Sequence, residues 1–108
     1  MREYLKDIRG GVAQADHQTG SNVDVNAATE TVSLDVNSQP DEVRIIVQNQ
    51  TGAFSVDVNF DNTSRVVQDN ANAAVDTQEP VVSDTTVDVV ISDDSGASNT
   101  VDYDILLV

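Results

Sequence analysis

From residue 22 onward, apolar side chains recur at every second position along much of this chain. The clearest run is 54–60, which reads Phe-Ser-Val-Asp-Val-Asn-Phe. Successive side chains of a β-strand point to opposite faces, so this period of two predicts strands with one buried face and one wet face. We therefore expect an all-β fold. The same alternation marks 23–26, 32–36, 43–47, 87–91 and 101–107.

Turn residues separate these runs. The segment 39–41, Gln-Pro-Asp, supplies one turn, and 49–52, Asn-Gln-Thr-Gly, is typical of a β-hairpin connection. Residues 61–80 are less regular: 65–67 would form a short edge strand, and the polar 69–79 would cross between sheets. The spacing predicts an antiparallel β-sandwich of about seven strands, with either immunoglobulin-like or jelly-roll topology.

The first 20 residues differ in kind from the rest, so we divide the chain into an N-terminal arm, 1–20, and a β-sandwich domain, 21–108. Charge divides in the same way, because residues 1–9 hold 3 of the 5 basic residues and only 2 of the 19 acidic ones. A net-positive stretch ahead of a strongly acidic domain favours an element that contacts another surface.

Tyr4, Leu5 and Ile8 follow a helical spacing within this arm. Residues 2–9 are therefore predicted to form two helical turns with one apolar stripe, ending at the glycine pair 10–11. A helix this short is marginal in water by itself. We expect the arm to become ordered on contact with a partner surface.

The acidic residues are numerous and unevenly chosen. The net charge is −14 at pH 7, with 15 Asp against 4 Glu and a single Lys. In dilute buffer these charges repel one another and weaken the compact state, whereas at molar salt the Debye length shrinks to about 3 Å and the repulsion largely vanishes. Short acidic side chains, scarce Lys and small apolar residues favour a protein adapted to high salt. The alternative is an acidic protein that works at ordinary salt.

This composition also excludes several partners and cross-links. The chain contains no cysteine, which excludes disulfides and thiolate metal sites. No cluster of Lys and Arg is present to displace counterions, so we expect no nucleic-acid partner. No apolar run is long enough to span a membrane. The basic start of the chain lacks the apolar stretch of a signal peptide, and we expect none.

No catalytic or cofactor signature is found in the sequence. The chain has no glycine-rich phosphate loop, nucleophile elbow or metalloprotease motif. His17, the only histidine, lacks the neighbouring ligands that zinc requires. Acidic pairs such as Asp102 and Asp104 are expected on the wet face of a strand. We therefore predict a protein that is not an enzyme and that has no cofactor and no metal site.

The loop 93–96, Asp-Asp-Ser-Gly, is the one place where a bound ion is a serious alternative. Oxygen-rich loops collect calcium or sodium, and Asp57 or Asp61 would assist as further ligands. However, the closing Glu of a helix-flanked calcium loop is missing, and strands flank this one. A simple β-turn is the better interpretation.

Three aliphatic residues, Ile46, Val90 and Leu106, stand on the polar side of their strands. If those strands are neighbours in one sheet, the three side chains form an outer apolar patch, which an acidic monomer has little reason to display. We expect this patch, like the stripe of the arm, to lie in contacts between subunits of a homo-oligomer. Cover by the chain's own arm or by residues 61–80 is the alternative.

A small acidic sandwich with a separate arm resembles the accessory capsid proteins of viruses that infect halophilic archaea, in composition and layout over the whole chain. The resemblance implies a virion protein that decorates or cements a shell, with other virion structural proteins, above all the major capsid protein, as its partners. An immunoglobulin-like adhesion or ligand-binding module of a haloarchaeal surface protein is the alternative. A tail or baseplate subunit of such a virus is a third interpretation.

Overall fold

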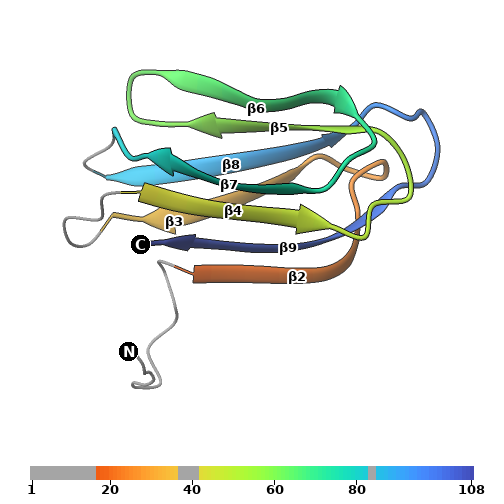
Figure 1. The fold of residues 1–108 in the computed structure, drawn as a ribbon, viewed down its shortest axis with the longest axis horizontal. Helices are drawn as coiled ribbons and strands as arrows, with labels where there is room; N and C mark the ends of the chain where they lie inside the picture. The colour runs from red at the N-terminus through yellow and green to blue at the C-terminus, as the bar shows by residue number, and fades with distance from the viewer. Residues whose placement is uncertain (1–16, 37–41, 83–84) are drawn as a thin grey trace.

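The computed structural model describes residues 17–36, 42–82 and 85–108, which fold into two packed antiparallel β-sheets (Figure 1). The predicted all-β sandwich is therefore confirmed, and the described residues hold eight strands where about seven were expected. The strands are β2 (His17–Asp24), β3 (Glu30–Asp35), β4 (Glu42–Gln48), β5 (Phe54–Asn59), β6 (Ser64–Ala71), β7 (Val75–Pro80), β8 (Thr86–Asp93) and β9 (Thr100–Leu107).

The strands pair in a nested order that defines the topology. β2 pairs with β9, β3 with β8, β4 with β7 and β5 with β6, as in one long hairpin. Two further pairings, β4 with β9 and β5 with β8, roll this hairpin into a first sheet, β2-β9-β4-β7, and a second sheet, β3-β8-β5-β6. Such a rolled ribbon is a jelly roll. An immunoglobulin sandwich would instead place the first two strands side by side in one sheet.

The core lies between the two sheets and is built from the alternating apolar positions. Phe54, Val56 and Val58 of β5 are fully buried, whereas Ser55 and Asp57 between them are partly exposed. Each fully buried aliphatic or aromatic side chain stabilises the fold by roughly 1.5–3 kcal/mol. The other core side chains are Val25, Val32, Leu34, Val43, Ile45, Val47, Phe60, Val75, Val87, Val89, Ile91, Val101 and Ile105.

The connection 49–52 is not a hairpin, and that prediction is wrong. It leads from β4 to β5, which lie in different sheets. Asn49 does adopt the left-handed conformation of a turn residue, with φ of 59°. Turn chemistry fixes only the local bend of the chain, and the strand partners are chosen by distant residues. Val47, for example, lies opposite Tyr103.

Residues 61–80 hold more regular structure than predicted. The short edge strand expected at 65–67 is part of the longer β6, and β7 follows it in the other sheet. The predicted crossover between sheets is present but is limited to 72–74. Both strands lie at sheet edges, where polar side chains are exposed and the alternation is weak.

The predicted boundary of the sandwich at residue 21 is too late, because β2 already begins at His17. Residues 17–20 are polar and form part of an edge strand, so no apolar alternation marks them. Gly20 lies under the ring of Tyr103, where an added Cβ would come within 2.4 Å of the ring. Residues 1–16, with the predicted helix and its apolar stripe, lie outside the described residues.

Tyr103 links the two sheets at this edge. Its hydroxyl donates a hydrogen bond of 2.8 Å to Oε2 of Glu30, at the start of β3. Burial raises the pKa of Tyr103 to about 12, and the hydrogen bond and negative charge of Glu30 add to the effect. The phenol therefore stays protonated and keeps donating over the whole physiological pH range.

Candidate functional site

Four connections meet at one end of the sandwich, at the right of Figure 1: β2–β3, β4–β5, β6–β7 and β8–β9. The nested order dictates this, because successive antiparallel strands run in opposite directions and every second connection emerges at the same end. We call this region the loop end. Clustered loops on a rigid scaffold are where binding and catalytic groups concentrate, so the loop end is the first candidate site.

Asn99, in the β8–β9 connection, is the one fully buried polar residue in the described part of the chain. Its Oδ1 accepts hydrogen bonds from the backbone N–H groups of Thr51 (3.1 Å) and Gly52 (3.0 Å). Its Nδ2 donates to the carbonyl oxygen of Ala53 and to Oδ1 of Asp93, both at 2.9 Å. The side-chain amide thus ties the β4–β5 connection to the β8–β9 connection.

Asp93 forms a second centre beside Asn99. Its Oδ1 accepts from the backbone N–H (3.0 Å) and the hydroxyl (2.6 Å) of Ser95. Its Oδ2 accepts from the N–H of Gly96 (2.9 Å) and from Nδ2 of Asn26 (3.0 Å). With the amide of Asn99, five donors converge on one carboxylate. These bonds, led by that of the Ser95 hydroxyl, hold the pKa of Asp93 far below its usual range although burial acts in the opposite direction.

This saturation argues against the ion considered for 93–96. Donors at both oxygens of Asp93 occupy the lone pairs that a cation would use. Asp57 lies on β5, and Asp61 lies in the β5–β6 connection at the opposite end, where it accepts from the Thr85 hydroxyl (2.7 Å). Across 17–36, 42–82 and 85–108, no three His, Asp or Glu side chains are grouped to hold a metal. The loop is a turn held by its own carboxylate.

Two further carboxylates act in the same way. Asp24 Oδ1 accepts from the backbone N–H groups of Asn26 (2.9 Å) and of the residue after it (3.3 Å), which lower the pKa of Asp24. Asp102 accepts from Nδ2 of Asn49 (2.8 Å) and from the backbone N–H of Asn22 (2.8 Å), which lower its pKa too. Asp24 therefore holds the turn that follows β2, and Asp102 joins the bulge of β2 at Asn22 to Asn49.

The remaining connection, β6–β7, joins this network through two side chains. Gln50 Nε2 donates to Oδ1 of Asn72 at 3.1 Å. The Ser55 hydroxyl donates to Asp94 and accepts from the backbone N–H of Asn70 at 2.9 Å. All four connections of the loop end are thus linked by hydrogen bonds.

The chemistry of the loop end is that of a rigid, permanently ionised surface. A general acid or base needs a free lone pair or proton and a pKa near the working pH. The carboxylates of Asp24, Asp93 and Asp102 have neither property, since donors occupy them and their pKa values are lowered. The arrangement supports holding shape and charge rather than transferring protons.

We expect Asp93→Asn to destabilise the domain at neutral pH and to flatten its acid unfolding. A carboxylate with a lowered folded-state pKa stabilises the fold above its unfolded pKa and loses that effect as the pH falls below it. The difference in melting temperature between the two proteins should therefore shrink between about pH 5 and about pH 2. Asp88→Asn, on the same strand but away from the loop end, is the matched control. A difference in melting temperature that stays constant across this range would show that the ionised carboxylate of Asp93 does not stabilise the fold.

His17 is placed as a structural residue. It lies at the start of β2, and its Nε2 is 2.6 Å from Oδ1 of Asp104, with side chains 41% and 48% exposed. Asp102 and Asp104 both lie on the outer face of β9, the wet face on which they are expected, and Asp102 has different partners and lies nearer the loop end. A half-exposed contact of this kind contributes less than about 1 kcal/mol.

The expected patch of Ile46, Val90 and Leu106 does not exist as one surface. Ile46 and Leu106 lie on the neighbouring strands β4 and β9 of the first sheet, whereas Val90 lies on β8 in the second sheet. Val90 is flanked by Thr31 and Asp57. Sequence spacing shows which face of its strand a residue occupies but not which sheet that strand joins. The predicted patch required the three strands to be neighbours in one sheet, and the strand of Val90 is not.

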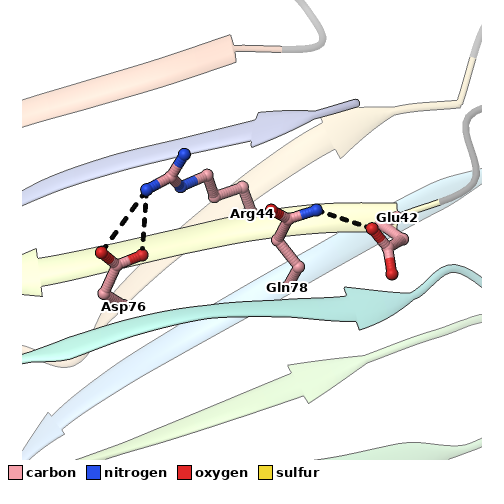
Figure 2. Close-up of polar contacts among 4 residues, drawn as sticks. All are labelled: Glu42, Arg44, Asp76 and Gln78. Carbon is pink, nitrogen blue, oxygen red and sulfur yellow. Dashed lines mark hydrogen bonds and ion pairs between the residues drawn. The ribbon is translucent and has the colours of Figure 1, made fainter.

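Polar side chains surround Ile46 and Leu106 on the outer face of the first sheet. Figure 2 shows Arg44 Nη2 donating to both carboxylate oxygens of Asp76, at 3.2 and 3.4 Å, and Gln78 donating to Glu42 at 2.6 Å. Arg44 lies directly opposite Leu106, and its Nε is buried without a hydrogen-bond partner. Aliphatic and charged side chains are therefore neighbours on this face.

Comparisons with known proteins identify no relative of the chain. No family model matches it, and neither a search of curated proteins nor one of solved structures finds a match. Among the described residues, no helix has the length and hydropathy needed to cross a membrane.

Proposed function

We propose that this chain is a non-enzymatic structural subunit of a larger assembly that works in concentrated salt. The most specific form of the proposal is an accessory capsid protein of a virus that infects halophilic archaea. Its partners would be the major capsid protein and further copies of the chain, and its location would be the virion.

The nested jelly-roll strand order carries this proposal. Jelly rolls occur as viral capsid subunits, as lectin domains and as cupins. Because a shared fold does not fix a function, these possibilities must be separated by the residues available for a site.

The residues available for a site favour the structural alternative. Ligand pockets are lined by exposed aromatic and apolar groups, but Phe54 and Phe60 are buried in the core and Tyr103 is packed over Gly20. A metal-dependent cupin needs several imidazole or carboxylate ligands in one place. The single histidine, His17, lies on the edge strand β2 and is paired with Asp104. A shell subunit needs a stiff domain of defined shape, which the hydrogen-bonded loop end supplies.

The test uses particles from the culture that produces the chain, in molar potassium chloride. We expect the full chain to co-sediment with the particles, and a variant lacking residues 1–16 to remain folded but stay in the supernatant. This deletion leaves β2 whole, since β2 starts at His17. A control with Glu3→Gln and Asp7→Asn keeps the apolar stripe and should still co-sediment. A full chain that never sediments with particles would contradict the proposal.

A further inference from the structure

The outer face of the first sheet carries a partly exposed apolar pair over which no described strand packs. Ile46 and Leu106 are both partly exposed on adjacent strands. Leu106 lies opposite Arg44 and Ile46 lies opposite Asp104, so the two aliphatic side chains are diagonal neighbours on one face. On that face Asp76 and Asp102 add further negative charge, and Arg44 is already paired with Asp76.

The chain enters the fold beside this pair. His17, the first residue of β2, lies directly opposite Leu106. Sixteen residues precede His17 in the sequence. Extended chain spans about 3.3 Å per residue, and neighbouring strands are about 4.8 Å apart. Residues 10–16 are therefore long enough to return residues 1–9 over Leu106 and Ile46 of the same chain.

The sequence of residues 1–9 complements this face. In helical spacing, Tyr4, Leu5 and Ile8 form the apolar stripe, and the three basic residues of the segment, Arg2, Lys6 and Arg9, fall at i, i+4 and i+7 along one side. An apolar stripe beside a basic one matches an aliphatic pair bordered by carboxylates. The rest of this acidic chain holds only two basic residues, Arg44 and Arg65.

We propose that residues 1–9 cover the outer face of the first sheet of their own chain, with the apolar stripe against Ile46 and Leu106 and the basic residues beside Asp76, Asp102 and Asp104. A short linker raises the effective concentration of the segment at its own sheet to the millimolar range, which favours this contact over contact with another molecule. The inference goes beyond the structural role proposed above. In the free subunit the apolar stripe is covered by its own sheet, and during assembly the stripe leaves that sheet and binds a neighbouring subunit.

Disulfide cross-linking tests this placement directly, because the chain contains no cysteine. The test pair is Lys6→Cys with Gln48→Cys, which lies two residues beyond Ile46 on the outer face of β4. The control pair is Lys6→Cys with Asn59→Cys, an exposed position on the outer face of the second sheet. In molar salt we expect the test pair to form a cross-link within the monomer about tenfold faster than the control pair. Equal rates, or cross-links that join two chains, would overturn the proposal.

Methyl NMR of the full-length protein gives a second readout that needs no cysteine. Changing Tyr4, Leu5 and Ile8 to serine should shift the methyl signals of Ile46 and Leu106, while the signals of Val90 on the other sheet stay in place. If the Ile46 and Leu106 signals do not move, the segment does not lie on this face. The experiment is independent of particles, so its failure leaves the proposed structural role to be judged separately.

Discussion

Replacing Asn99 with alanine is expected to be the most damaging substitution of a polar residue in the described part of the domain. The side chain is fully buried, and its amide satisfies the backbone N–H groups of Thr51 and Gly52 and the carbonyl oxygen of Ala53. Each buried polar group left without a partner costs about 1–3 kcal/mol. Allowing for partial rescue by water, we expect a loss of about 2–4 kcal/mol in the free energy of unfolding, measured by urea denaturation in molar salt.

Two matched variants make this prediction specific. Ser98→Ala removes only a long, exposed hydrogen bond to Asp24 (3.5 Å) and should change stability by less than about 0.5 kcal/mol. Asn99→Asp preserves the shape and the acceptor but removes the donor to Ala53 and sets a second carboxylate against Asp93. It should therefore be nearly as damaging as alanine at neutral pH and less damaging near pH 4. If Asn99→Ala and Ser98→Ala were equally mild, Asn99 would not be the centre of the loop end.

The second large effect is the dependence of the fold on salt. The net charge is −14, and the arginines Arg44 and Arg65 are each already paired with one acid. Lowering potassium chloride from molar concentration to about 0.1 M lengthens the Debye length from about 3 Å to about 10 Å, so that repulsion reaches across neighbouring strands. We expect the β signal in circular dichroism to be lost over this range. A melting temperature indifferent to salt would contradict the proposed adaptation to high salt.

A charge-reduced variant separates screening from other effects of salt. Asp35, Asp57 and Asp88 lie on the outer face of the second sheet, alternating with the buried side chains of their strands. Changing all three to asparagine removes negative charge without touching the core or the loop end. The variant should need less salt than the parent to reach the same melting temperature. An unchanged salt requirement would show that repulsion on this face is not what salt relieves.

The sequence was sufficient for the elements of the fold because burial on one face imposes a period of two on any strand. The run at 54–60 is a strand with Phe54, Val56 and Val58 in the core, as its alternation predicts. The alternation misses or shortens the edge strands β2, β6 and β7, because both faces of these strands are largely exposed and impose no such period on the sequence.

The pairing of strands could not be predicted from the sequence in the same way. Asn49 and Gly52 have the residue types of a hairpin turn, yet the chain between them crosses from one sheet to the other. That choice depends on pairings between residues far apart in sequence, such as Val47 with Tyr103, which no local spacing records. For the same reason, local spacing does not show that Val90 lies in a different sheet from Ile46 and Leu106.

The loop end was only partly visible from the sequence. The turn at 93–96 was predicted, because Asp, Ser and Gly are turn residues. Asn99 was not singled out, since one asparagine in a polar loop resembles any other. Its importance comes from burial against Thr51 and Gly52, which lie 48 and 47 residues earlier. An asparagine just before a strand, in a loop otherwise made of small residues, is the only local signal that could have drawn attention to it.

The most direct test of a structural role is the copy number of the chain in purified particles. Particles from the producing culture should be banded on a density gradient in molar salt, and the chain and the major shell protein quantified by mass spectrometry across the fractions. A structural subunit predicts a constant ratio of the two proteins through the particle peak, and loss of the chain from that peak when residues 1–16 are deleted. A chain that is absent from the peak, or whose ratio to the shell protein varies from fraction to fraction, would contradict the account.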